Sequence, residues 1–258
     1  EEIIITGPDK DLHSGMYGGI AVNPARILTC ILSKLHDEDG AVTIPDFYDG
    51  VPELPQNILD QWLGLNFKHD QFLADVGLST PAGEKDRSAL EMLWSRPTCE
   101  INGIKAGYIG EGFKTVLPAQ ASAKISFRLV ANQDPLKIRK KFRNMVKDLL
   151  PDDCQVFFKE HEASKASQMD ISPPEFEKAR EAISEEWGIE AAFIGCGGSI
   201  PIAGYFQKIT GVDPMLIGFA KDDDQIHSPN EKYDLESFRK GIRSWVRVIN
   251  SFSELQNV

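Results

Sequence analysis

Hydrophobic and polar positions predict a strand and then a helix within the first 35 residues. Residues 2–6 form a short apolar run, typical of a strand. Apolar residues then recur at helical spacing over 27–35, and Asn23-Pro24 supplies an N-cap with Pro at the first helical position. Between the two elements lies a polar, glycine-rich cluster over residues 11–19, where a loop can present a side chain.

The same order of elements returns near residue 120. Residues 123–131 alternate apolar and polar side chains, which predicts a half-buried strand. Asp134-Pro135 begins a helix with one apolar stripe, and residues 154–159 predict another strand. Two strand-helix-strand units predict an open sheet with two helices on one face, the ferredoxin-like arrangement.

A long segment rich in Pro, Asp and Gly separates the two units, at about 45–96. It contains two helical patches, at 57–63 and 88–94, and we interpret it as an insertion in a first domain that spans residues 1–170.

From about residue 172 the pattern changes to alternating helices and short strands. Helices are predicted from Pro174 to Gly188, from Pro201, and from about Leu235, where apolar residues keep a 4-3-4-3 spacing. Two runs between them, 191–194 and 215–220, predict strands. The pattern indicates an α/β layer over 171–258, and so short a segment buries little surface, which indicates part of a larger domain.

Composition narrows the class of protein. The 258 residues carry a net charge of −11, which argues against a nucleic-acid partner, because such proteins need a basic face. No apolar run is long enough for a membrane span, and the first residues lack the features of a signal peptide, so we expect a cytoplasmic protein without a membrane partner. The four cysteines are widely spaced without a C-x-x-C pair, which favours reduced thiols in or near the core.

Two histidines are candidates for chemistry. His13 lies among glycines that can leave its imidazole exposed, although histidines in such loops are more often structural. His227 follows a predicted strand in a loop with several acidic residues. Ligands gather at the carboxyl ends of strands in open α/β sheets, so His227 is either a metal ligand or a solvated loop residue.

Three further segments could bind a substrate. The turn over 195–201 joins a predicted strand to a helix, so its backbone N–H groups and Ser199 could bind a carboxylate or an oxyanion, or its glycines could serve only a tight turn. Arg128 lies on the polar face of its strand and could grip a carboxylate or simply be exposed. Thr115 follows a glycine-containing turn, which by itself indicates little.

Taken in order, these motifs resemble the metal-dependent dipeptidases related to carnosinase and cytosolic nonspecific dipeptidase, within the wider family of aminoacylase and succinyl-diaminopimelate desuccinylase. The matching motifs cover nearly the whole chain, and they are Asp11-Leu-His13-Ser14-Gly15, Gly110-Glu111-Gly112 with Thr115-Val-Leu-Pro118, Phe127-Arg128 with Asn132-Gln133-Asp134-Pro135, Gly197-Gly198-Ser199-Ile-Pro201, and His227-Ser228-Pro229-Asn230-Glu231.

The resemblance implies an α/β protein in which an α+β lid, ferredoxin-like and responsible for homodimerisation, accompanies the C-terminal part of a metallopeptidase catalytic domain. It implies that His13 reaches into the active site of the partner subunit and stabilises the oxyanion. Arg128 and Thr115 would bind the substrate from the lid, and Gly198 and Ser199 from the catalytic domain. His227 would be a ligand of one of two divalent metal ions, zinc or else manganese, that activate water to hydrolyse a dipeptide or an N-acyl amino acid.

The family places its other metal ligands and its catalytic glutamates before the lid, and nothing before Asp11 matches them. The chain is therefore expected to lack the N-terminal half of the catalytic domain, to hold no two-metal centre alone, and to be inactive by itself. Two hypotheses follow, an enzyme fragment or a non-catalytic dimerisation or binding module. The retention of His13, Arg128, Ser199 and His227 together favours the fragment.

Overall fold

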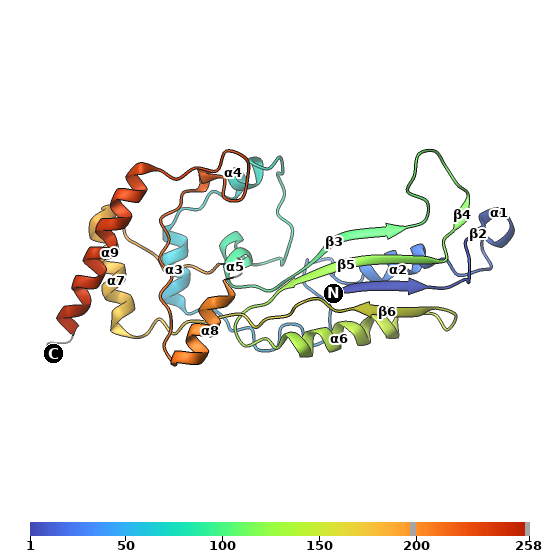
Figure 1. The fold of residues 1–258 in the computed structure, drawn as a ribbon, viewed down its shortest axis with the longest axis horizontal. Helices are drawn as coiled ribbons and strands as arrows, with labels where there is room; N and C mark the ends of the chain where they lie inside the picture. Colours follow the sequence, from blue (N-terminus) through green and yellow to red (C-terminus); the bar gives the residue numbers. More distant parts are fainter. Residues whose placement is uncertain (197–199, 256–258) are drawn as a thin grey trace. The chain divides into compact units, whose positions relative to one another are not determined.

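The computed structural model describes residues 1–196 and 200–255, which form two compact units (Figure 1). Of these residues, unit 1 contains 1–54, 67–167 and 195–196, and unit 2 contains 55–66, 168–194 and 200–255. The elements of unit 1 are β1 (Glu2–Thr6), β2 (Leu12–His13), α1 (Ser14–Tyr17), α2 (Pro24–Leu32), α4 (His69–Ala74), α5 (Ala89–Trp94), β3 (Thr98–Ala106), β4 (Val116–Leu117), β5 (Gln120–Arg128), α6 (Pro135–Asp148) and β6 (Gln155–Lys159). Those of unit 2 are α3 (Gln56–Gly64), α7 (Pro174–Trp187), α8 (Pro201–Thr210), a 3-10 turn (Asp222–Asp224) and α9 (Leu235–Leu255).

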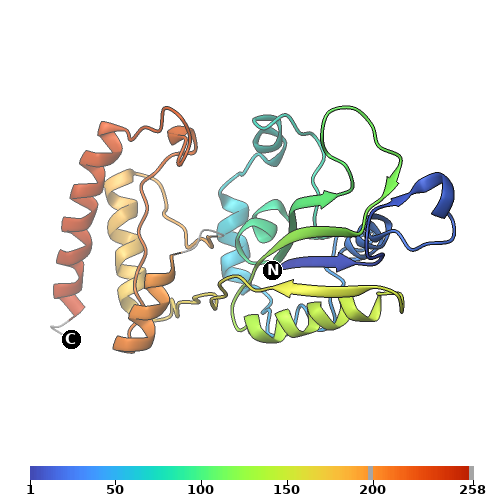
Figure 2. The same cartoon turned by 45° about the vertical axis from the view of Figure 1, so that its right-hand side comes forward.

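Unit 1 is built on a four-stranded sheet in the order β3-β5-β1-β6, in which all neighbours are antiparallel (Figure 2). Ile3 of β1 lies opposite Ala123 of β5 on one side and Phe158 of β6 on the other. With α2 between β1 and β3 and α6 between β5 and β6, this order is the ferredoxin-like arrangement. The predicted fold of this part is therefore confirmed.

The helices α2 and α6 pack on one face of that sheet. Their apolar stripes, which include Leu28 and Phe142, form a single core with Ile3, Ile5 and Ile125 of the strands. Each helix begins where its sequence predicts. The side chain of Asn23 accepts a hydrogen bond from the amide of Ala25 at 3.0 Å, and that of Asp134 from the amide of Leu136 at 2.8 Å.

A two-stranded ribbon of β2 and β4 lies beyond one end of the main sheet (Figure 1). It joins the sheet where β1 ends and β5 begins, and the amide of Gly7 donates to the carbonyl of Ala119 at 3.1 Å. The strand β3 and this ribbon were not expected from the sequence. Residues 98–106 mix charged, glycine and apolar residues around a bulge between Ile101 and Gly103, so no regular alternation marks them.

Unit 2 consists of helices and irregular chain. The helix α7 begins after Pro173 and ends at Gly188, whose φ of 71° is the left-handed conformation that glycine adopts without strain. It packs along α9, and Trp187 donates to the hydroxyl of Ser244 at 3.0 Å. The strands predicted at 191–194 and 215–220 are wrong, because in the described part of unit 2 no strand lies beside either segment to pair with it.

The helix α9 buries small residues and leaves most of its large apolar residues exposed. Its aromatic and branched residues at 4-3-4-3 spacing, such as Phe238, Trp245 and Ile249, are exposed. Its buried positions are Ser237, Gly241, Ser244 and Val248, and Val248 contacts the α7 residues Ala179 and Ala182. Small residues on both helices allow a close approach, which leaves the large apolar stripe of α9 on the outside.

The segment of about 45–96 is shared between the units. Residues 55–66, with α3, belong to unit 2, where Trp62 donates to the carbonyl of Phe193 at 2.7 Å, whereas α4 and α5 belong to unit 1. The division into a lid over 1–170 and a catalytic segment over 171–258 stays a prediction. Within residues 1–196 and 200–255, no helix has both the length and the apolar composition needed to cross a bilayer.

Candidate active site

His13 and Thr115 lie together on the β2–β4 ribbon. His13 is opposite Val116 in the ribbon, and the amide of Ser14 donates to the carbonyl of Thr115 at 2.9 Å. Both side chains are exposed. The short strand β2 thus places two of the predicted site residues, far apart in the sequence, on one projecting element.

The backbone that carries His13 is held on both sides. Before it, a carboxylate oxygen of Asp11 accepts a hydrogen bond from the amide of Ala119 at 2.8 Å. After it, α1 begins at Ser14. These contacts fix the backbone at His13 although its side chain is exposed.

Arg128 lies at the opposite end of unit 1. It is the last residue of β5, where it pairs with Thr98, whereas the ribbon adjoins the first residue, Gln120 (Figure 1). Eight residue steps along a strand span about 27 Å. The structure therefore brings His13 and Thr115 together, and it separates both of them from Arg128 within one chain.

The glycine-rich turn before α8 is only partly described. Gly198 and Ser199, which the sequence analysis expects to bind substrate, lie outside the described residues. Cys196, just before them, is exposed, and α8 begins at Pro201 as predicted.

His227 lies in an exposed loop that follows the 3-10 turn of unit 2. Its φ of 61° is in the left-handed region, and so are the φ values of Gln225 (54°) and Asn230 (64°). A loop with three such residues needs contacts that hold it, because this conformation is unfavourable for residues with a side chain.

Asp224 supplies those contacts from a buried position. Its carboxylate accepts a hydrogen bond from the amide of Lys221 at 2.8 Å and pairs with the ammonium of Lys232 at 3.1 Å, which closes the loop around His227. The hydrogen bond from Lys221 lowers the pKa of Asp224 against the opposing effect of burial. Asp223 and Asp224 in turn raise the pKa of Lys232, so the pair is charged at neutral pH.

The described residues do not form a metal site by themselves. Across 1–196 and 200–255, no group of three or more histidine, cysteine or acidic side chains is arranged to hold an ion. His227 is a suitable nitrogen donor, yet one ligand does not hold a divalent cation. A metal centre would therefore need donors from elsewhere.

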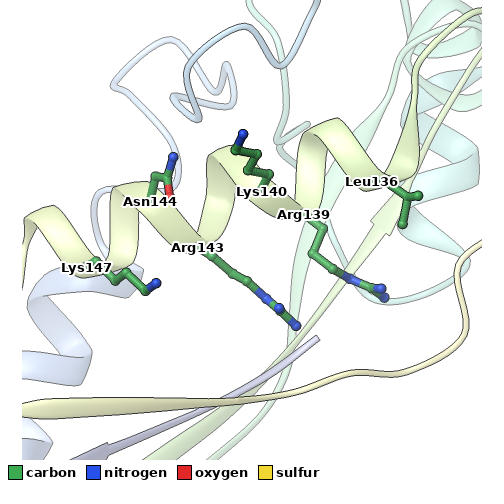
Figure 3. A pocket seen from close by; sticks show the side chains of 6 residues that line it. All are labelled: Leu136, Arg139, Lys140, Arg143, Asn144 and Lys147. Atoms are coloured by element: carbon green, nitrogen blue, oxygen red, sulfur yellow. The ribbon is translucent and has the colours of Figure 1, made fainter.

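A shallow basic groove on α6, of about 240 Å³, is separate from these residues. Arg139 and Arg143 point the same way from the helix and Lys140 and Asn144 point away (Figure 3). Both arginines form ion pairs with the buried carboxylate of Glu1, at 2.9 Å and 2.6 Å. Their charges are thus already used within unit 1, which favours a structural role.

Sequence reasoning missed two supporting residues, Asp11 and Asp224. Each lies in a motif that was singled out for its histidine, two or three positions before it. An acidic residue in a polar loop is usually solvated, so the only signal in the sequence is that each aspartate lies close to a candidate histidine.

Comparison with known proteins identifies the family. A family model described as the peptidase dimerisation domain matches residues 2–154. The Cys-Gly metallodipeptidase DUG1 of Candida albicans is 32% identical over 94% of this chain and 51% of its own. Human Beta-Ala-His dipeptidase is 26% identical over 96% of this chain and 49% of its own.

A solved structure agrees with these relatives. The M20 family metallo-carboxypeptidase Sso-CP2 from Sulfolobus solfataricus superimposes with a TM-score of 0.79 at 26% identity, over 96% of this chain and 56% of its own. The chain thus spans about half the length of the curated relatives it matches. The chain belongs to the M20 peptidase family, and residues 2–154 are its peptidase dimerisation domain.

Proposed function

We propose that the protein, in its complete form, is a metal-dependent dipeptidase that works as a homodimer through the lid. Its substrate class is dipeptides or related N-acyl amino acids. Support comes from the metallodipeptidase relatives and from the dimerisation-domain match. A cytoplasmic location stays a prediction.

One observation carries the dimeric part of this proposal. His13 and Thr115 lie on the ribbon at one end of β5, and Arg128 lies at the other end, about 27 Å away along the strand. A dipeptide is far shorter than that distance, so one substrate molecule does not reach both groups in one chain. We therefore propose that each active site takes His13 and Thr115 from one subunit and Arg128 from the other.

The proposed roles follow from the chemistry of each side chain. Arg128 binds a carboxylate or a carbonyl oxygen with its planar guanidinium group. His13 donates a hydrogen bond to the oxyanion that develops when the peptide carbonyl is attacked, and Thr115 contacts the substrate beside it. Gly198 and Ser199 bind the substrate from the catalytic domain, with backbone N–H and hydroxyl groups.

Metal use is proposed for the complete protein only. His227 would contribute one nitrogen ligand, held by the loop that Asp224 closes, and two zinc ions, or else manganese, would supply Lewis-acid activation of water when bound. The remaining ligands would come from a part of the protein outside this chain. The chain alone is accordingly proposed to be inactive.

The surface of unit 2 supports the proposal that a further part of the protein completes the catalytic domain. Large apolar side chains are exposed on two of its helices, among them Phe206 (53%) and Ile209 (80%) on α8 and Leu235 (71%) and Ile249 (66%) on α9. Exposed apolar groups at this density are unfavourable in water, and they mark surfaces that other protein covers. We propose that the rest of the catalytic domain covers them.

Mixed dimers test the composite site directly. In a version extended with the family's catalytic half, His13→Ala and Arg128→Ala are each expected to lower dipeptide hydrolysis by about a hundredfold or more. When the two variants are mixed and allowed to exchange subunits, each mixed dimer holds one intact site and one doubly altered site. About a quarter of the wild-type activity is therefore expected to return at equal mixing, because half of the dimers are mixed.

The matched control uses two changes on the same side of the site. A mixture of His13→Ala with Thr115→Ala is expected to show no recovery, since both residues come from one subunit. Absence of recovery in the His13–Arg128 mixture, with subunit exchange verified by mass, would show that the site is built within one subunit.

A second experiment addresses the chain as it stands. Dipeptide hydrolysis is measured with added zinc or manganese, on this polypeptide and on the extended version. Activity in the extended version alone supports the proposal, and activity in the short chain contradicts the missing-ligand argument. Inactivity of both versions would favour the alternative of a non-catalytic dimerisation or binding module.

A further inference from the structure

The imidazole of His13 is held by the backbone two residues later. His13 occupies the N-cap position of α1, and its Nδ1 accepts a hydrogen bond from the amide of Gly15 at 3.1 Å. A backbone amide only donates, so Nδ1 carries a lone pair and no proton. In the neutral ring the proton is then on Nε2.

Position 15 has little room for a side chain beside the ring of His13. A Cβ atom there would lie 3.0 Å from Cε1 and 3.3 Å from Nδ1 of His13. Gly15 does not adopt a positive φ, so backbone conformation does not explain the residue. A side chain at this position would require the ring to shift by a few tenths of an ångström relative to the amide that holds it.

The other ring nitrogen is available to a ligand. His13 is exposed, and Nε2 has no hydrogen-bond partner among the residues that the structure describes. The fixed backbone on both sides, through Asp11 and the Ser14–Thr115 contact, keeps the ring near one position.

We propose that Gly15 is a positioning residue, whose N–H group selects the Nε2–H tautomer of His13 and so makes its outward nitrogen a hydrogen-bond donor. The functional meaning rests on the proposed dipeptidase function. A neutral imidazole in this tautomer can stabilise an oxyanion without first taking up a proton, whereas the Nδ1–H tautomer would present a lone pair to it and repel it.

The tautomer is measured on this chain by nuclear magnetic resonance with ¹⁵N- and ¹³C-labelled histidine above pH 7.5, with His13→Gln to assign the signal. His13 is expected to show the Nε2–H form alone, and His227, which is exposed and has no hydrogen bond or ion pair to the described residues, serves as the internal reference for a mixture. A His13 spectrum equal to that reference, or one with the Nδ1–H form dominant, overturns the proposal without any variant.

Two variants then distinguish the effect of the Gly15 contact on the His13 tautomer from a general disturbance of the fold. Gly15→Ala is expected to convert the His13 signal into a tautomer mixture, while Met16→Ala, on the same short helix, leaves it unchanged. In the extended enzyme, Gly15→Ala is expected to lower kcat about tenfold with little change in KM. Because the spectrum needs no activity, an inactive extended enzyme contradicts the dipeptidase proposal and leaves the tautomer result intact.

Discussion

The side chain of Gln133 donates a hydrogen bond to the backbone carbonyl of Phe47 inside the core of unit 1, across 86 residues of sequence. Its other end accepts a hydrogen bond from the amide of Val130 at 2.8 Å. Only 1% of Gln133 is exposed, so both groups are satisfied away from water. The contact joins the loop after β5 to the segment around Phe47, which is distant in the sequence.

Replacement of Gln133 by Leu is expected to lower the free energy of unfolding by about 2 kcal/mol, because the buried carbonyl of Phe47 and the partly buried amide of Val130 lose their partners. Denaturant unfolding measures the change. Asn132→Ala, an exposed neighbour, is the control and is expected to have little effect. If both substitutions lower the free energy of unfolding equally, the buried hydrogen bonds of Gln133 do not have this stabilising role.

The N-cap of α6 predicts a pH dependence. Hydrogen bonds from the amides of Leu136 and Lys137 hold the pKa of Asp134 below its usual range. A depressed folded-state pKa stabilises the protein above the unfolded pKa, near 4, and the contribution is lost as the pH falls through the folded value.

Asp134→Ala is accordingly expected to destabilise unit 1 at pH 7, and the difference from the wild type is expected to shrink below about pH 4. Thermal unfolding from pH 7 to pH 3 measures it. Asp148→Ala removes a carboxylate from the other end of the same helix and controls for net charge. A difference that stays constant over this range would contradict the role of the Asp134 charge.

The loop that carries His227 depends on Asp224 more than on its neighbour Asp223. Asp224 is buried and contacts both ends of the loop, whereas Asp223 is exposed and pairs with Lys232 at 3.0 Å. Asp224→Ala is therefore expected to increase amide hydrogen exchange at Lys232, whose N–H donates to the carbonyl of Asp224, while Asp223→Ala changes it little. Similar exchange in the two variants would rule out this special role.

Thiol reactivity distinguishes exposed from buried cysteines. Burial raises the pKa of Cys99 to about 12, and burial also raises that of Cys154, whereas Cys30 is exposed. In a Cys196→Ser background, one equivalent of a thiol reagent is expected to react in the folded state and two more after unfolding. The double variant Cys30→Ser, Cys196→Ser keeps only Cys99 and Cys154. If its folded form reacts rapidly with the thiol reagent, these two cysteines are not buried.

Much of unit 1 follows from local sequence. The period-2 pattern and the caps Asn23 and Asp134 identify β5, α2 and α6 within a few residues, because they depend on neighbours along the chain. The resemblance likewise pointed to His13 and Thr115 as candidate site residues, with Thr115 grouped with Arg128 rather than with His13. Nothing local indicates β2 or β4, since two-residue strands exist only through the pairing of Leu12 with Leu117 and of His13 with Val116.

Tertiary structure alone decided which faces and which residues meet. The spacing in α9 identifies a helix, yet it does not say that Ser244 and Val248 pack inward while Trp245 and Ile249 remain exposed. It also does not say that Arg128 lies a strand length away from His13, because distance in space depends on the strand order β3-β5-β1-β6. The sequence by itself determined the longer helices, the caps Asn23 and Asp134, and the family, because these rest on local preferences and on motifs. Only the fold decides the strand register, the strand pairing and the hydrogen bond from Gly15 to the His13 ring, because these depend on how segments meet in space.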